Sequence, residues 1–346
     1  MTSSLPLLAA APLVAGLLGV PTTGVPAIRQ TAAEPGQRAV NIPALPLTAE
    51  VATPGTPDVV EHTVAPTASE RKRVLDYWTP RRMASALPVD RLSKATGLLG
   101  RLFDRAGRGA APHRSPNGAA TRTSGARWTS GGMVERTTGR VFLTIKGSDF
   151  VCSASSVRSA NRDLVVGHCV KDGTGAWADN WTFVPGYSQG RRPYGQYTAR
   201  RMFVAGPWSR GGDDSHDIGM VAVNTSDGKH LGDAVGGQQI AFGTPRGRPT
   251  SGFGFPADSP YDGEHLVYCA GTLRDDPNGQ TGDQGMRCDM TAGSSGGPWL
   301  SGFDASTGRG TIVSVSSFKY SDDHRTMYGP YFGDSARELY AMAATS

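Results

Sequence analysis

Cysteine, metal-ligand spacings and long hydrophobic runs are all scarce in this sequence. Its four cysteines among 346 residues are too few for a miniprotein held together by disulfides, but they suit one ordinary domain with two bridges. No two cysteines have the Cys-x-x-Cys spacing of a zinc site, and the seven histidines are scattered. We therefore expect no metal and no other cofactor. The apolar run at residues 5–20 is shorter than the roughly 20 residues that a membrane-spanning helix needs.

Positive charge is concentrated in the first part of the chain. Residues 1–127 hold 15 of the 35 Lys and Arg residues but only eight of the 30 Asp and Glu residues, so the remainder is slightly acidic. A basic leader on a near-neutral domain does not indicate nucleic-acid binding. The basic residues also lack the interleaved aromatic side chains that stack on bases. We expect no nucleic-acid partner.

The first 127 residues have the composition of an export leader. The apolar run is followed by Val25-Pro26-Ala27, which resembles a small-residue cleavage site. Residues 1–27 are therefore predicted to be a signal peptide rather than a membrane anchor. Residues 28–127 are rich in Ala, Pro, Thr and Arg and are predicted to be a propeptide or a disordered leader. Within them, residues 69–75 and 89–103 are the pieces able to become ordered.

From about Trp128 the sequence predicts an all-β domain that extends to residue 346. Short β-prone runs alternate with clusters of Gly, Asn, Asp and Pro, and the whole chain has 46 glycines and 24 prolines. This pattern favours a barrel or sandwich over a helical bundle. Only residues 334–344 look helical. The predicted strands are residues 141–145, 164–166, 181–184, 218–223, 240–242, 265–269 and 311–316.

Three segments of this domain carry residues suited to nucleophilic catalysis. An apolar run ends at His168, Asp217 opens the apolar run 218–223, and the glycine-rich stretch 293–298 holds Ser295. A serine hydroxyl needs an adjacent base, histidine titrates near neutrality, and a buried carboxylate fixes the imidazole tautomer. The chain order His, Asp, Ser is that of chymotrypsin and differs from that of subtilisin and the α/β-hydrolases.

Two other carboxylates compete for the role of Asp217. Asp213 and Asp214 lie just upstream of it. Asp217 is preferred because the apolar strand that follows it directly would bury its carboxylate beside the base.

Residues 130–340 resemble a trypsin-like serine peptidase, most closely the secreted bacterial branch that includes the glutamyl endopeptidases. The resemblance implies two six-stranded antiparallel β-barrels with the active site between them. It implies His168 as general base, Asp217 as its orienting carboxylate and Ser295 as nucleophile, with the amides of Gly293 and Ser295 as the oxyanion hole. It also implies a secreted, extracellular endopeptidase that matures from a zymogen and acts on proteins or peptides. We expect a monomer without a membrane anchor after signal removal.

The resemblance also implies how the cysteines pair. A bridge between Cys152 and Cys169 would pin the loop that carries the histidine, as in the family. A bridge between Cys269 and Cys288 would close a second loop just upstream of Ser295. Four cysteines allow three connectivities, and only this local pairing places both bridges beside catalytic elements.

Two features depart from the family pattern. The run before His168 is two residues shorter than usual, which preserves strand alternation and requires the loop 158–163 to adjust. Ser294 stands where trypsin-like zymogens have the Asp that receives the new N-terminus. Serine cannot form that ion pair, so activation here must differ.

Substrate preference is left open between two classes. Asp289 lies six residues before Ser295, the offset at which trypsin has the Asp that selects Arg or Lys, but the glutamyl branch often has an Asp there without basic specificity. The stretch 312–317 lacks the His that glutamyl enzymes use. Basic and small or uncharged side chains are equally expected, and acidic ones least. Ser314, Val315 and Ser316 would pair with the substrate backbone as an added strand.

Two other functions are compatible with the same residues. The first is a catalytically silent binding or scaffold protein on this fold, for which the shortened run before His168 is the argument. The second is an esterase that uses the same triad.

Overall fold

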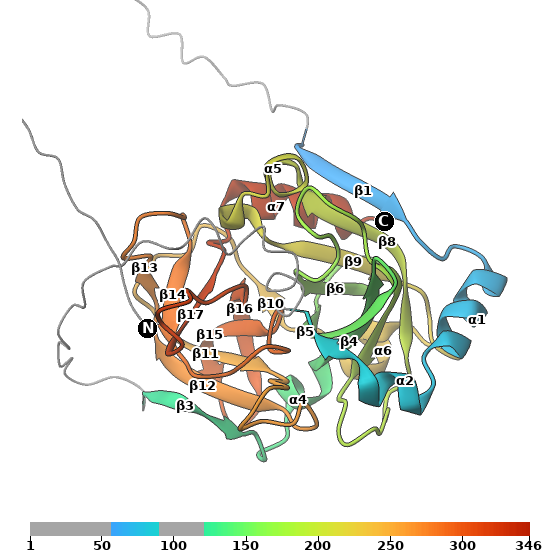
Figure 1. Cartoon of the computed structure of the whole chain (residues 1–346), viewed down its shortest axis with the longest axis horizontal. Coiled ribbons are helices and arrows are strands. Elements are labelled where there is room, and N and C mark those ends of the chain that lie inside the picture. Colours follow the sequence, from blue (N-terminus) through green and yellow to red (C-terminus); the bar gives the residue numbers. More distant parts are fainter. Residues whose placement is uncertain (1–56, 90–120) are drawn as a thin grey trace, which may run out of the picture. The chain divides into compact units, whose positions relative to one another are not determined.

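Six strands of the first lobe close into an antiparallel barrel (Figure 1). The hydrogen-bonded order is β8-β7-β4-β5-β6-β9, and β9 returns to pair with β8. Every residue of β4 and β6 is buried, as expected for strands that face a core on one side and packed segments on the other. This confirms the predicted first barrel. Its strands are β4 (Thr138–Ile145), β5 (Ser148–Val157), β6 (Leu164–Gly167), β7 (Asp179–Pro185), β8 (Tyr197–Ala205) and β9 (Gly219–Val223).

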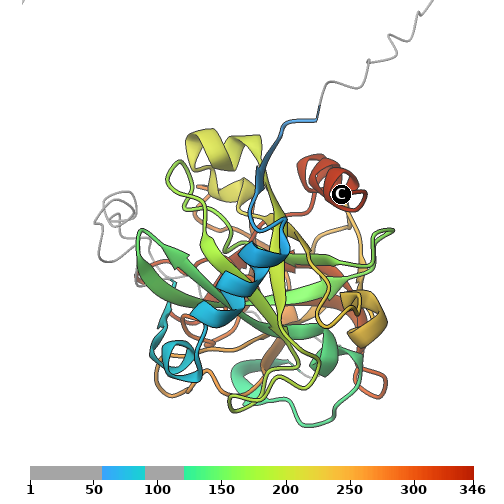
Figure 2. The same cartoon turned by 90° about the vertical axis from the view of Figure 1, so that its right-hand side faces the viewer.

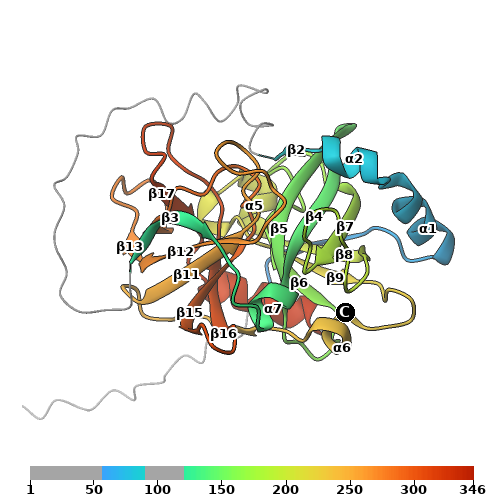
Figure 3. The ribbon, with the colours of Figure 1, turned by 90° about the horizontal axis from the view of Figure 1, so that it is seen from below.

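The second lobe is built from two sheets. One has the order β10-β16-β15-β11-β12-β3 and the other the order β13-β14-β17. Figure 3 shows these strands on one side of the barrel strands β4 to β9. The arrangement confirms an all-β, chymotrypsin-like fold. The strands are β3 (Arg122–Arg127), β10 (Gln239–Ile240), β11 (Pro249–Gly254), β12 (Val267–Thr272), β13 (Arg274–Asp275), β14 (Gln284–Arg287), β15 (Pro298–Asp304), β16 (Arg309–Val315) and β17 (Thr326–Gly329).

Short helices lie outside the sheets. The C-terminal helix α7 (Asp334–Ala343) begins where the sequence predicts, and it buries Leu339 in a core cluster that also contains Phe142 and Phe253. That cluster joins side chains from both lobes. The remaining helices of the peptidase part are α4 (Met133–Thr137), α5 (Gly206–Gly211), the 3₁₀ turn η1 (Asp214–His216) and α6 (Leu231–Val235).

The computed structural model describes residues 57–89 and 121–346. The predicted signal peptide and most of the predicted piece 89–103 lie outside these residues. Residues 57–89 fold as β1 (Val59–Thr63), α1 (Ala68–Tyr77), α2 (Pro80–Ser85) and β2 (Leu87–Pro88). The predicted ordered piece 69–75 thus lies within α1. Figure 2 shows α1 crossing the strands of the first lobe.

Within the described residues, no helix has both the length and the apolar character needed to cross a membrane. Removal of residues 28–127 as a propeptide stays a prediction.

Candidate active site

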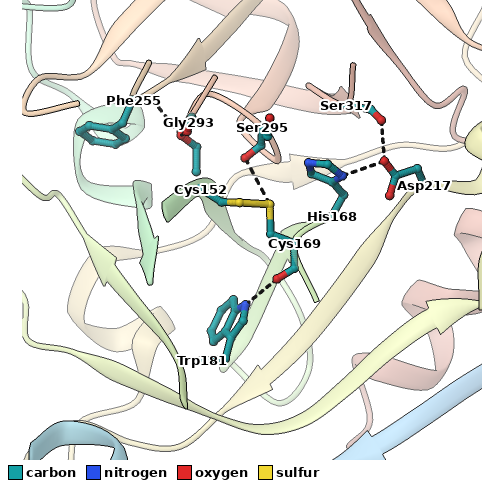
Figure 4. Close-up of a disulfide and its surroundings, with 10 residues drawn as sticks. Cys152, His168, Cys169, Trp181, Asp217, Phe255, Gly293, Ser295 and Ser317 are labelled. Carbon is teal, nitrogen blue, oxygen red and sulfur yellow. Dashed lines mark hydrogen bonds and ion pairs between the residues drawn. A yellow bond between two sulfur atoms is a disulfide. The ribbon is translucent and has the colours of Figure 1, made fainter. Parts of the chain in front are cut away.

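The register of two neighbouring strands brings the predicted base and carboxylate together. β6 and β9 are antiparallel, with Gly167 opposite Gly219. The residue after β6 and the residues before β9 therefore meet at the same end of the pair. His168 Nδ1 lies 2.7 Å from Asp217 Oδ2 (Figure 4), and Asp217 is only 4% exposed.

Asp217 receives a second hydrogen bond that the sequence analysis missed. Ser317 Oγ donates to Asp217 Oδ2 at 2.5 Å, so one carboxylate oxygen holds both the imidazole and a hydroxyl from the second lobe. A carboxylate only accepts, so Nδ1 carries the proton and Nε2 is left as the basic nitrogen. Ser317 follows directly after the three residues predicted to bind substrate.

The competing carboxylates have other contacts. Asp213 Oδ1 accepts from Ser215 N at 3.0 Å, and its Oδ2 lies 3.1 Å from His216 Nδ1. Burial raises the pKa of Asp214 to about 6, and the charges of Asp217 and Asp213 add to this effect. Asp217 is the carboxylate that touches His168.

The turn that carries Ser295 packs against the histidine loop. The Ser295 carbonyl accepts from Ser153 N at 2.8 Å, and Cys169 Sγ lies 3.9 Å from the same oxygen. Gly296 has φ +82°, and a Cβ there would lie 2.4 Å from Ser153 O and 3.2 Å from His168 N. Only glycine allows this approach. The structure thus brings His168, Asp217 and Ser295 together from the two lobes (Figure 4).

Two peptide planes in this turn have fixed orientations. Ala292 O accepts from Ala257 N at 2.7 Å, and Ser294 O accepts from Gly297 N at 2.9 Å. The N–H of a trans peptide points opposite to its carbonyl. The N–H groups of Gly293 and Ser295 therefore point away from these two internal hydrogen bonds.

Ser153 on β5 is a second residue that the sequence analysis missed. Its Oγ donates to Gly293 O at 2.9 Å and accepts from Phe255 N at 2.8 Å. Together with its amide, which binds Ser295 O, this buried serine ties the first lobe to both ends of the stretch 293–295. No local sequence signal marks it, because its partners lie more than 100 residues away.

Both predicted disulfides are present. Cys152 on β5 is bonded to Cys169, and Cys269 on β12 is bonded to Cys288. The first bridge anchors the residue next to His168, and Trp181 Nε1 donates to Cys169 O at 3.0 Å to hold the same loop (Figure 4).

Asp289 uses its carboxylate within the protein. Its Oδ1 accepts from Gly125 N on β3 and from Tyr261 Oη, each at 2.7 Å. Burial acts to raise the pKa of Asp289, but the hydrogen bonds from Gly125, Tyr261 and Ser124 and the charge of Lys319 outweigh it, so the pKa lies below its usual range.

The predicted substrate-pairing residues flank the nucleophile turn. Ser316 N donates to Gly297 O at 2.9 Å, and Ser316 O accepts from Gly296 N at 2.6 Å. Val315 and Ser314 pair with the start of β15. These residues support the turn, and their pairing with substrate stays a prediction. Within residues 57–89 and 121–346, no group of three His, Cys, Asp or Glu side chains is arranged to hold a metal ion.

Comparison with solved structures defines the class. The protease Anisep from Arthrobacter nicotinovorans is 42% identical with a TM-score of 0.58, and the match covers 61% of this chain and 96% of that one. The thermostable serine protease AL20 from an extremophilic microorganism is 38% identical with a TM-score of 0.59, over 62% of this chain and 99% of that one. A Glu endopeptidase, 19% identical with a TM-score of 0.51 over 64% of this chain and 97% of that one, shows the same fold.

Neither a protein-family model nor a curated protein matches the chain. The 42% identity to Anisep, which extends over 96% of the Anisep chain, nevertheless shows common ancestry. The chain belongs to the trypsin-like serine peptidases of the chymotrypsin fold.

Proposed function

We propose that this protein is a secreted serine endopeptidase that hydrolyses peptide bonds through His168, Asp217 and Ser295. The observation that carries the proposal is the hydrogen bond from His168 Nδ1 to a buried Asp217, made beside the turn that holds Ser295. Protease relatives favour protein or peptide substrates. The two disulfides suit an oxidising, extracellular location.

The mechanism assigns one task to each residue. Ser295 Oγ bonds to the scissile carbonyl carbon while its proton moves to His168 Nε2, and the carbonyl electron pair becomes an oxyanion. Asp217 stabilises the imidazolium. When the C–N bond breaks, His168 gives the proton to the leaving amine. Water then repeats the sequence on the acyl-enzyme and releases the acid.

The oxyanion is assigned to the amides of Gly293 and Ser295. The internal hydrogen bonds of Ala292 O and Ser294 O fix the two peptide planes before substrate arrives. Donors that are fixed in advance need no reorganisation during the reaction, and for this reason the removal of one donor lowers the rate about 10²–10³-fold.

For the side chain before the cleaved bond, we propose a small or uncharged residue. A basic residue would need the Asp289 carboxylate, which already accepts two strong hydrogen bonds and lies near Lys319. Cleavage profiling of a peptide library tests this assignment. We expect Asp289→Asn to keep the wild-type preference, and cleavage mainly after Arg or Lys that Asp289→Asn abolishes would overturn it.

A fluorophosphonate probe tests the triad itself. We expect labelling of the secreted, processed protein and none of Ser295→Ala, with amide substrates hydrolysed as well as esters. A folded protein that the probe does not label would indicate a silent scaffold. Ester hydrolysis without amide hydrolysis would indicate an esterase, because amide cleavage depends more on protonation of the leaving group.

A further inference from the structure

Residues 57–89 pack on the first barrel as one of its structural layers. We call this segment the strap. β7 pairs with β8 only at Tyr197 and Thr198, and β1 of the strap adds an antiparallel strand to the edge of β8 that lies beyond this pairing, in register from Val59 opposite Ala205 to Thr63 opposite Arg201. β2 pairs with β5 at the other end. The strap therefore spans the barrel from one strand edge to another (Figures 1 and 3).

The strap packs buried apolar side chains against the outer face of the barrel. Trp78 is 1% exposed, its ring centroid lies 5.5 Å from that of Phe142, and its Nε1 donates to Asn180 O. Ala65, Val74 and Met83 are buried in the same cluster. Without the strap, a tryptophan-sized hollow over β4 and an open β8 edge would be exposed, and both are aggregation hazards.

Polar groups of the barrel also bond to the strap. The amide of Asn224, a residue only 7% exposed, donates to Ala65 O at 3.0 Å. Asp149 accepts from Tyr77 Oη at 2.6 Å and pairs with Arg82 at 2.9 Å. Arg201 pairs with Glu61, and Arg210 pairs with Asp58. These polar bonds fix how the strap lies on the barrel, and the buried apolar side chains of Trp78, Val74 and Met83 give the contact the apolar character of a permanent interface.

The strap contacts the barrel away from the candidate active site. Its partners lie mainly on β4, β5, β7, β8 and α5, and it also contacts Asn224 after β9 and Trp177 in the loop that follows His168. The active-site residues themselves lie where β6 ends and β9 begins and in the turn 293–297. The strap therefore binds mainly to the wall of the barrel.

We propose that the surface formed by the β8 edge and the outer face of β4, β5 and β7 is a permanent binding site for residues 57–89. The strap stays bound to this surface in the mature enzyme, and it stays bound even when the chain is cut between residues 89 and 121. This inference does not rest on the proposed catalytic function. The solved relatives match 61–62% of this chain, a share that residues 128–346 could account for without the strap.

The experiment uses the full chain with a specific protease site inserted between residues 89 and 121. After the cut, we expect the strap to co-elute with the peptidase in gel filtration at one copy each, and to separate only on denaturation. Elution of the peptidase alone, folded and with an unchanged melting temperature, would overturn the proposal. The readout is binding of a fragment, so it is independent of whether the protein cleaves peptides.

Two variants and a matched control locate the interaction. Trp78→Ala is expected to lower the melting temperature of the cut complex by about 10 °C and to release the strap. Glu61→Lys is a milder change that places a like charge beside Arg201 at the half-exposed rim, and it is expected to weaken strap binding about tenfold, with a marked dependence on salt. Leu75→Ala lies on the same helix α1, but its side chain is 41% exposed, so it should behave as wild type. Equal behaviour of the three variants would contradict the assigned interface.

Discussion

Replacement of Ser153 by alanine tests whether this serine positions the nucleophile turn. The change removes one hydroxyl, which leaves the Gly293 carbonyl and the Phe255 amide without the partner that each has in the structure. Each buried polar group left unpaired costs about 1–3 kcal/mol. Neighbouring groups can shift and relieve part of this cost, so we predict a loss of about 2–4 kcal/mol in the free energy of unfolding.

The same change should slow catalysis. Ser153 fixes the carbonyl side of Gly293, while Ala257 fixes the peptide that carries the Gly293 N–H. The oxyanion donor is therefore loosened rather than removed. We expect kcat to fall about tenfold to a hundredfold, less than the 10²–10³ for complete loss of a donor, with KM nearly unchanged.

Ser155→Ala is the matched control for this prediction. Ser155 is a buried serine on the same strand, but its Oγ donates only to the neighbouring Ser156 O at 3.2 Å. We expect it to lose about 1 kcal/mol of stability and to keep wild-type kcat. Denaturant unfolding and steady-state kinetics on both variants decide the matter. The reasoning would be refuted if Ser153→Ala and Ser155→Ala lost the same unfolding free energy and Ser153→Ala kept the wild-type kcat.

Three further predictions concern the rest of the structure. Asp217→Asn should lower kcat about 10⁴-fold at neutral pH, because the amide favours the wrong tautomer of His168, and it should change the fold little. Steady-state kinetics measure the loss of kcat and circular dichroism checks the fold. A fall in kcat of less than tenfold would argue against the triad. Replacing Cys152 and Cys169 together by serine should cost about 2–4 kcal/mol in unfolding free energy and lower activity as well, since the bridge holds the loop next to His168. Burial raises the pKa of Asp283 to about 8. Between about pH 4 and pH 8 the folded protein therefore keeps a proton on this carboxyl group that the unfolded chain has already released. Through this group the unfolding free energy falls by about 1.4 kcal/mol for each pH unit as the pH rises. Asp283→Asn should flatten that slope, and parallel wild-type and variant stability curves over this range would contradict it.

Strands with clear apolar patterns could be predicted from the sequence. The runs 141–145, 164–166, 181–184 and 218–223 fall within or overlap β4, β6, β7 and β9. The disulfide pairing was also predicted and is confirmed, and the structure places His168 in contact with Asp217, while their catalytic roles stay a prediction.

Strands that carry polar residues among apolar ones could not be predicted in the same way. β5 carries four serines and β8 carries two arginines in mid-strand. Arg201 is matched by Glu61 of the strap, and Arg200 donates to the carbonyl of Ser346 at 2.9 Å. These partners lie 140 and 146 residues away in the sequence, so no local window contains the reason for either arginine. The roles of Ser153 and Ser317 escaped prediction for the same reason.

The short run before His168 is the argument for a catalytically silent scaffold. The pairing of β6 with β9 weakens this argument for a physical reason. The position of the histidine depends on which residues of β6 and β9 face each other, not on the number of residues in the preceding motif. The loop 158–163 before β6 is anchored at both ends: Arg158 N donates to Gln238 O at 2.9 Å, and Asp163 accepts from Leu231 N at 2.8 Å. With Gly167 held opposite Gly219, His168 still reaches Asp217 at 2.7 Å. A shorter motif therefore leaves the pairing of base and carboxylate intact, because the register is set by the strands on both sides of the loop.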